Sequence, residues 1–263
     1  MATVLESNKT KIAKRVIEVF EYFDQDRPDA TVMDIVRRYG RPQSSTSELL
    51  SSLVEMGLLY KNPQSRSYWP TPRLAIMGAD AQPPALRNGR LFAFMDNLAR
   101  TTRHSVALFG MVGAHVQIFH WAPAPHIDAI DIFRGSSEQL SASAAGHLLL
   151  SSLEGELAGR LLRRLNAEAP PDAKFNVAEL SERIAQYGRQ GHATGTAGFV
   201  PDSLITATLL PCPREERPLA LGFLYPDGAS IDLQALLGTL ERGIAACRAD
   251  DERAPSAPFM IAV

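Results

Sequence analysis

The sequence predicts an α+β protein in two parts: a small helical head that ends in a β-hairpin, and a larger antiparallel sheet with helices. Three helical patterns and two short apolar segments fill the first 70 residues. Two apolar strands around a glycine turn follow at residues 105–121, and helical patterns separate them from two further strands. Strands grouped apart from helices are typical of α+β domains. The chain has 263 residues, enough for both parts.

The bulk composition is that of a globular protein without an export signal. Hydrophobic residues make up 45% and charged residues 21% of the chain. No apolar run approaches the roughly 18 residues of a membrane span, and the N-terminus lacks the apolar core of a signal peptide. We therefore expect a cytoplasmic protein. Cys212 and Cys247 are expected to be unpaired thiols. Residues 1–73 hold 11 basic and 9 acidic residues, a weak excess in the direction that DNA binding requires.

The first two helices of the head are defined by periodicity and by caps. Residues 9–24 place apolar side chains three and four positions apart, which predicts one helix with a buried face. Thr31 begins the second helix, with Asp34 positioned to complete a capping box. Gly40 ends that helix, in the usual role of glycine at a helix C-terminus.

A tight turn and a third helix follow. Residues 41–43 are too few for anything but a turn. Ser45 and Glu48 then have capping-box spacing, which predicts a helix over residues 46–56. Two short helices joined by such a turn, packed on a first helix, are the helix-turn-helix arrangement.

A β-hairpin completes the head. Residues 58–60 and 67–70 have strand character, and the polar segment 61–66 between them is the predicted tip. A hairpin directly after the third helix is a wing, so the head is predicted to be a winged helix-turn-helix. An alternative is a winged-helix fold that serves only in dimerisation or protein contact.

The DNA-binding surface is predicted from side-chain chemistry. The third helix offers hydroxyl and amide groups to phosphates and base edges, although it also carries Glu48 and has no Lys or Arg. Basic residues on the first helix, around the turn and on the wing would hold the DNA backbone. The predicted DNA-binding residues are Lys9, Lys14, Arg38, Arg41, Gln43, Ser44, Ser45, Thr46, Ser47, Lys61 and Arg66.

A linker is expected between the two parts. Residues 74–84 predict a short helical turn and a proline-marked break, and residues 85–101 predict a helix with one apolar face. Two roles for that face remain open. It could form the seam of a dimer, or it could pack on the chain's own second domain. The residues of the face are Leu86, Leu91, Phe94, Met95 and Leu98.

The second part begins with strands and ends with a helix. The glycine-rich segment 191–198 has no phosphate-loop context and is interpreted as a flexible connection. The predicted strands are 105–111, 115–121, 127–133, 203–210 and 218–225, and the predicted helices are 142–152, 154–166, 177–190 and 230–248.

Several segments together resemble the IclR-type transcriptional regulators. They are residues 39–46 with the Leu-rich stretch to Leu59, the small-residue segment 140–150, and residues 189–193 followed by the strand 204–210. The resemblance implies a winged helix-turn-helix joined by a linker helix to a GAF-like effector-binding domain. Glu48 stands where the family usually has a basic residue, and His147 stands where it usually has a lysine.

The resemblance also implies an effector site. In the family the effector lies in a cup between the sheet and the small-residue turn. The matching positions here are Ser141, Ala142, Ala144, Ala145, Thr206, Thr208 and Gly222. Family members that bind small carboxylates have polar side chains at such positions, whereas several here are apolar or glycine, so a more apolar, aromatic effector is expected. The broader expected class is an aromatic or carboxylate metabolite, and the candidate walls are Phe109, His120 and Phe133. For each residue the alternative is ordinary core packing.

The functional prediction is therefore a DNA-binding transcriptional regulator with a small organic effector. No common catalytic motif is present, the six histidines have no ligand spacing, and we expect no enzyme activity, metal or cofactor. Alternatives are a small-molecule-binding enzyme and a protein-interaction module without DNA binding. Paired operator half-sites would call for a homodimer or homotetramer. The expected parts are 8–73 (DNA-binding domain), 74–102 (linker), 103–248 (effector-binding domain) and 249–263 (tail).

Overall fold

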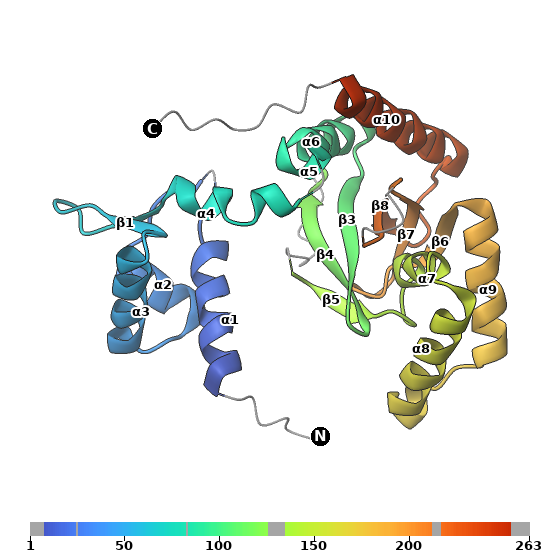
Figure 1. Ribbon diagram of the computed structural model, residues 1–263, viewed down its shortest axis with the longest axis horizontal. Helices are drawn as coiled ribbons and strands as arrows, with labels where there is room; N and C mark the ends of the chain where they lie inside the picture. The colour runs from blue at the N-terminus through green and yellow to red at the C-terminus, as the bar shows by residue number, and fades with distance from the viewer. Residues whose placement is uncertain (1–7, 25, 83, 126–134, 212–216, 254–263) are drawn as a thin grey trace. The chain divides into compact units, whose positions relative to one another are not determined.

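The computed structural model describes residues 8–24, 26–82, 84–125, 135–211 and 217–253 (Figure 1). The chain forms two compact units, Met1–Pro83 and Pro84–Val263, and each is described by itself. The first is a helical head with a β-hairpin, and the second is an antiparallel sheet with helices, so the predicted α+β fold class is confirmed. None of the helices in the described part of the chain has the length and apolar character of a membrane span.

The first unit packs three helices around a small apolar core. Its buried residues include Leu50 and Leu53 of the third helix, which share one cluster with Val19 and Ile35 of the preceding helices. The elements are α1 (Asn8–Glu21), α2 (Val32–Tyr39), α3 (Gln43–Glu55), β1 (Leu59–Lys61), β2 (Tyr68–Pro70), α4 (Pro72–Ile76) and the 3₁₀ turn η1 (Ala79–Ala81).

Local signals place α2 correctly but not the start of α3. The hydroxyl of Thr31 accepts from the Asp34 amide, and the Asp34 carboxylate accepts from the Thr31 amide, so the predicted capping box is confirmed. Gly40 closes α2 with φ +62°, a conformation that glycine adopts without strain. The capping box predicted at Ser45 is wrong. Because α3 already begins after Pro42, whose backbone is extended, Ser45 lies inside the first turn.

The wing is a two-stranded antiparallel hairpin in which Leu59 pairs with Pro70. A single backbone bridge between Ala30 and Tyr68 ties the segment before α2 to the second strand. Tyr68 is almost fully buried in the core of the head, which fixes the base of the wing against the helices.

The second unit is built on a six-stranded antiparallel sheet with the order β5-β4-β3-β8-β7-β6. Its strands are β3 (Ser105–Val112), β4 (His115–Ala122), β5 (Ser137–Gln139), β6 (His192–Thr196), β7 (Ser203–Leu209) and β8 (Leu219–Pro226). Its helices are α5 (Pro84–Arg87), α6 (Arg90–Thr102), α7 (Ala144–Ser151), α8 (Gly155–Glu168), α9 (Val177–Gln190) and α10 (Leu233–Arg253), with a 3₁₀ turn η2 (Pro171–Ala173).

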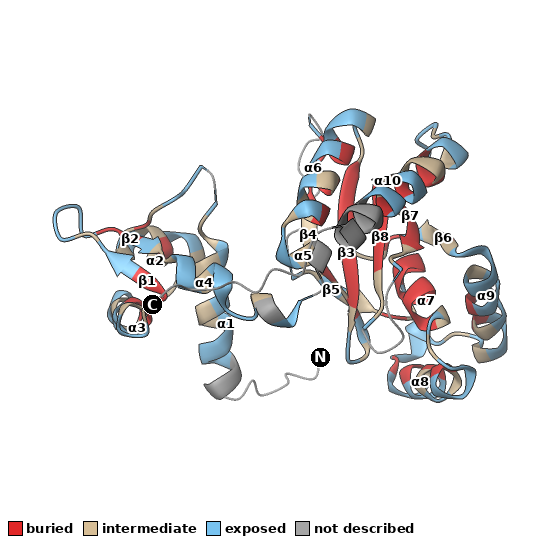
Figure 2. Cartoon of the chain, turned by 45° about the horizontal axis from the view of Figure 1, so that its top comes forward, coloured by how far each residue is buried: buried red, intermediate tan, exposed pale blue. Residues whose placement is uncertain are grey.

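Helices cover both faces of this sheet, and the buried strands lie between them (Figures 1 and 2). On one side, here called the α7 face, Phe109 and Ala207 pack with residues of α7, α8 and α9. On the other side, the α6 face, Leu108 and Phe223 pack with residues of α6 and α10. Because side chains alternate along each strand, neighbouring residues of one strand belong to different cores.

The predicted linker helix is interrupted and packs on its own unit. The helix breaks at Asn88 and Gly89, where Gly89 has φ +73°, and α6 starts at the next residue. Leu91, Met95 and Leu98 are buried against the α6 face of the sheet. Of the two roles left open for this apolar face, the structure therefore supports packing on the chain's own second domain.

The structure differs from the sequence predictions in two segments of the second unit, residues 191–198 and the region after residue 248. The segment 191–198 was expected to be a flexible connection, but it contains β6, because hydrogen bonds from β7 order it as an edge strand. The predicted strand 127–133 lies outside the described residues. The last helix runs to Arg253, into the region expected to be a tail.

Candidate functional site

The exposed face of α3 carries polar side chains at helical spacing. Gln43, Ser44, Glu48 and Ser51 are exposed and Ser47 is half-buried, so one stripe of the helix is open to solvent over three turns. Carbonyl, hydroxyl and amide groups on such a stripe can meet base edges and phosphates when a helix enters the major groove. Three of the predicted contact residues, Gln43, Ser44 and Ser47, lie on it.

Two other predicted contact residues turn inward. Thr46 is 1% exposed, and its hydroxyl donates to the carbonyl of Pro42 at 2.8 Å. The hydroxyl of Ser45 accepts from the guanidinium of Arg15 on α1 at 3.2 Å. Thr46 therefore belongs to the core of the head, and Ser45 to the packing of α3 on α1. The spacing of Thr46 from Leu50 and Leu53, four and seven positions, was the signal in the sequence that placed it on the buried face.

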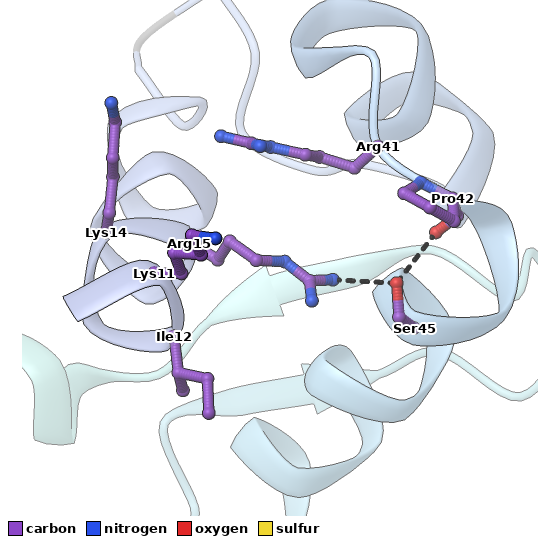
Figure 3. A pocket seen from close by; sticks show the side chains of 7 residues that line it. All are labelled: Lys11, Ile12, Lys14, Arg15, Arg41, Pro42 and Ser45. Carbon is purple, nitrogen blue, oxygen red and sulfur yellow. Dashed lines mark hydrogen bonds between the residues drawn. The ribbon is translucent and has the colours of Figure 1, made fainter. Parts of the chain in front are cut away.

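A basic hollow of about 540 Å³ lies between α1 and the start of α3 (Figure 3). Figure 3 shows Arg15 extending from α1 toward Ser45, and Arg41 extending from the turn before α3 toward α1. The hollow brings together four cationic side chains, and no carboxylate is among its lining residues. The lining consists of Lys11, Ile12, Lys14, Arg15, Arg41, Pro42 and Ser45.

Arg41 is held in place by a carboxylate outside the hollow. Its Nε and Nη2 atoms donate to the two carboxylate oxygens of Glu18 at 3.2 and 2.6 Å. The Glu18 side chain is 14% exposed, so the pair is partly shielded from water. A two-pronged bond of this kind fixes the guanidinium plane. It also offsets part of the positive charge that Arg41 brings to the hollow.

The remaining predicted basic residues lie on α1, on α2 and on the wing. Lys9 is in α1, but its side chain lies outside the described part of the structure. Arg38 is exposed in the last turn of α2. The ammonium of Lys61 on β1 lies over the Tyr68 ring, 5.3 Å from its centroid. Arg66 is exposed at the wing tip with φ +59°.

The residues predicted to bind an effector fall on both faces of the second unit's sheet. The core of the α7 face includes Phe109, Ala144 and Ala145. Gly222 lies in β8 between Leu221 and Phe223, which belong to the core of the α6 face, so the Cα of Gly222 faces the α7 side. Ser141 and Ala142 lie in the turn before α7. The structure therefore places four of the predicted residues, Phe109, Ala144, Ala145 and Gly222, on the α7 face, and two, Ser141 and Ala142, in the turn that leads into α7.

The other predicted effector residues do not join this group. His120 faces the α6 side, where its ring lies 4.6 Å from that of Phe92, because a β-bulge interrupts the pairing of β3 and β4 beside it. Thr206 and Thr208 alternate with Ala207 of the α7 face and so also point away from it. Phe133 lies outside the described residues.

Thr206 belongs to a chain of three hydroxyl groups on the α6 face, in which Thr206 and Tyr225 are buried and Thr194 is half-buried. Its Oγ1 lies 3.0 Å from that of Thr194 and 2.7 Å from the hydroxyl of Tyr225. Burial raises the pKa of the Tyr225 phenol above its usual value. Each hydroxyl has a partner, so this chain joins β6, β7 and β8 and offers little to a ligand.

Ser143 was not singled out from the sequence. It occupies the N-cap position of α7, yet its side chain makes no capping bond. Its hydroxyl is fully buried and, within the described residues, has no hydrogen-bond partner. The first turn of α7 is buried beside it, and its leading amides have no acceptors within the helix. Because the helix was predicted to begin at residue 142, Ser143 was expected inside the helix and was not identified as its N-cap.

His147 ties the turn before α7 to the helix. One ring nitrogen lies 2.8 Å from the carbonyl oxygen of Ser141, and its ring stacks on that of Tyr187 in α9 with centroids 6.4 Å apart. Burial lowers the pKa of the His147 imidazole below its usual value. The fold therefore favours the neutral ring. Through its contact with the Ser141 carbonyl, this ring fixes the turn that leads to Ser143. No three His, Cys, Asp or Glu side chains form a group that could hold a metal ion among the residues described.

Comparison with known proteins agrees with this geometry. Residues 13–63 match the family model of the IclR helix-turn-helix domain. No curated protein sequence matches the chain. An IclR homolog from Microbacterium hydrocarbonoxydans, in complex with 4-hydroxybenzoate, superposes with a TM-score of 0.62 at 18% identity, covering 92% of this chain and 100% of that one.

Two further solved structures share the whole fold. An IclR transcriptional regulator from Alicyclobacillus acidocaldarius gives a TM-score of 0.61 at 20% identity, covering 93% of this chain and 98% of that one. The IclR protein of Thermotoga maritima gives 0.61 at 12% identity, covering 92% and 99%. Residues 13–63 therefore match the model of a helix-turn-helix domain of IclR type, and the chain as a whole shares the fold of these solved structures.

Proposed function

We propose that this chain is a transcriptional regulator that binds operator DNA through the exposed face of α3 and through the wing. The observation that carries the proposal is the basic hollow beside α3 in a head of helix-turn-helix type. The α3 stripe has no cation of its own, so affinity for the polyanionic backbone would come from α1 and the turn before α3. Such contacts position a helix in the groove, and the polar stripe then meets the bases.

A binding titration tests this function. Fluorescence anisotropy of labelled duplexes, including the DNA upstream of the chain's own gene, is measured between 50 and 200 mM salt. We expect specific binding whose affinity falls steeply with salt, because each phosphate contact releases condensed counterions. If no duplex binds at the lowest salt, with or without metabolites, the assignment as a DNA-binding regulator is wrong.

We further propose that the second unit binds a small carboxylic acid at the buried N-terminus of α7. The Ser143 hydroxyl without a partner and the leading amides of α7 are donors suited to a carboxylate. The ring of Phe109, stacked on that of Phe199 with centroids 5.8 Å apart, is an apolar neighbour of α7 within the same core. The homolog from Microbacterium hydrocarbonoxydans was crystallised with 4-hydroxybenzoate, which makes an aromatic acid the first class to test.

Thermal unfolding tests the effector class. A ligand that binds only the folded protein raises the melting temperature as its concentration increases. We expect 4-hydroxybenzoate or a related aromatic acid to raise it, and the corresponding amide or alcohol to have a smaller effect. A panel of aromatic and aliphatic acids that leaves the transition unchanged would remove the support for this class.

Regulation would couple the two units. In this proposal residues 8–73 bind DNA, residues 74–102 connect the units, and residues 103–248 bind the effector. The protein acts as a homodimer or homotetramer, so that two heads meet two operator half-sites. The effector would shift the population toward the arrangement that it binds better, and DNA affinity would change by the same coupling free energy. Sedimentation with and without ligand measures the assembly.

A further inference from the structure

Glu48 gives the recognition surface of α3 an unusual chemistry. It is exposed in the second turn of the helix, between Ser44 and Ser51 on the solvent stripe. No hydrogen bond or ion pair holds its carboxylate within the described part of the head, while its backbone carbonyl accepts from the hydroxyl of Ser52 at 3.1 Å. The helix contains no Lys or Arg. Its only charged groups are therefore the carboxylates of Glu48 and Glu55.

A carboxylate in the major groove has few acceptable partners. It accepts hydrogen bonds and donates none at neutral pH, and it is repelled by phosphates. Guanine presents only acceptors there, N7 and O6, and thymine presents the acceptor O4 beside a methyl group. Only the amino groups of cytosine and adenine donate. Adenine also places its N7 acceptor beside the amino group, which opposes the second carboxylate oxygen, whereas cytosine has no neighbouring acceptor on the same base.

We propose that Glu48 selects cytosine at one position in each operator half-site. This inference rests on the DNA-binding function proposed above and adds the base that one named side chain reads. The exposed carboxylate makes binding unfavourable wherever it meets guanine or thymine, so Glu48 contributes discrimination at a cost in affinity. The four cations of the hollow between α1 and α3 compensate without contacting bases. Replacing the selected cytosine lowers affinity about 5- to 150-fold, the range of one good base contact.

Selection from a randomised duplex library tests the proposal. The wild-type protein, Glu48→Gln and Glu48→Ala are each used to enrich sequences, and the preferred base at every position is compared. We expect the wild-type protein to enrich cytosine at one position of each half-site. Glu48→Gln is expected to shift that position to adenine, because an amide can donate to N7 and accept from the amino group. Glu48→Ala is expected to lose the preference there and to bind non-specific DNA more tightly.

Glu55→Gln is the matched control, because it makes the same charge change on the same helix, two turns further along. It should leave the preference at the cytosine position unchanged. A second readout uses a duplex in which this cytosine carries an N4-methyl group. In a Watson–Crick pair that methyl replaces the amino hydrogen in the major groove. The modification should weaken binding by the wild-type protein and leave binding by Glu48→Ala unchanged.

The outcomes separate this inference from the function on which it rests. If all three proteins enrich the same bases at every position, Glu48 reads no base and the inference is overturned, while DNA binding stands. If the wild-type protein enriches no sequence and binds no duplex at low salt, both are overturned. Because Glu48 is exposed and unpaired within the described head, its variants should fold, and matching circular-dichroism melts verify this.

Discussion

The guanidinium of Arg41 and the carboxylate of Glu18 form a two-pronged ion pair that joins the turn before α3 to α1. Arg41 is also a wall of the basic hollow, whereas Glu18 is not. The substitution Arg41→Ala would therefore have two effects: it removes a cation from the hollow, and it leaves a shielded carboxylate without its partner. A loss of DNA binding in that variant alone would not distinguish them.

Glu18→Gln separates the two effects. The amide keeps the shape of the side chain and removes the negative charge beside Arg41. We expect affinity for DNA of any sequence to rise by up to about fivefold, while the free energy of unfolding of the head falls by about 0.5–1 kcal/mol. Anisotropy titrations and urea unfolding measure the two quantities. A fall in DNA affinity would show that the pair orients Arg41 productively and would contradict the expectation.

The salt dependence of DNA binding should report on the hollow. Lys11 and Lys14 are exposed on α1 and line it. If each contacts one phosphate, the double variant Lys11→Ala/Lys14→Ala should reduce the slope of log affinity against log salt by about 1.8. The loss should be the same for specific and non-specific duplexes. The control Arg163→Ala/Arg189→Ala makes the same charge change on exposed residues of the second unit and should leave the slope intact.

Thr46 and Ser47 are neighbours in α3, one buried in the core and the other half-buried on the exposed stripe, and they give a paired test. Thr46→Val removes a hydroxyl whose acceptor, the Pro42 carbonyl, still receives the residue 46 amide. We expect stability to fall by about 1 kcal/mol or less and DNA affinity to stay unchanged. Ser47→Ala should instead leave the melting temperature almost unchanged and weaken binding to the preferred duplex. If Thr46→Val alone weakened DNA binding, α3 would have a different face toward the groove.

Several elements whose partners are near in sequence were predicted correctly. The Thr31–Asp34 box and the hairpin of β3 and β4 depend on neighbours within a few positions or one turn. The capping box expected at Ser45 is a local prediction that was wrong, because α3 already begins after Pro42. Two other differences depend on distant contacts. The segment 191–198 is ordered as β6 by β7, and Ser45 is drawn into the packing of α3 by Arg15, 30 positions earlier. Periodicity along one segment contains no information about such partners.

In the effector region, too, a local feature was predicted correctly and the features that depend on strand pairing were not. The small-residue segment correctly marked a buried turn and helix at α7. Which strand residues face it could not be predicted, because the face of each residue depends on register. The β-bulge next to His120 and the alternation around Thr206 place both side chains on the other side of the sheet.

The pH dependence of stability should reveal the buried imidazole of His147. Burial holds its pKa in the folded protein below the ordinary value of about 6.5 that applies to the unfolded chain. As pH falls below about 6.5 the unfolded chain takes up a proton that the folded protein resists. The contribution of the neutral ring to the free energy of unfolding is therefore fully present above this pH and decreases as the pH falls below it. Burial also lowers the pKa of His104, so that group contributes in the same direction.

Urea unfolding between pH 8 and pH 5 measures this dependence. His147→Gln should flatten the decrease below pH 6.5, and His104→Gln should flatten it by a smaller amount because this ring is less buried. An unchanged pH profile in His147→Gln would mean that the imidazole has the same pKa in the folded and unfolded protein and takes up a proton equally readily in both. That result would contradict the lowered pKa that burial gives this ring.

Ser143→Ala should behave unlike an ordinary N-cap substitution. Loss of a capping serine typically costs about 1 kcal/mol, because a backbone amide of the first turn loses its acceptor. Here the hydroxyl makes no capping bond and lies buried without a partner in the described structure. A buried polar group in that state costs about 1–3 kcal/mol, so its removal should leave the melting temperature of the ligand-free protein unchanged or raise it.

If a carboxylate binds at this position, the same variant should lose most of the thermal shift that an aromatic acid produces in the wild-type protein. Ser151→Ala, at the far end of the same helix, is the matched control and should retain the shift. A destabilised Ser143→Ala protein that responds fully to the acid would assign Ser143 to helix capping and exclude it from the effector site.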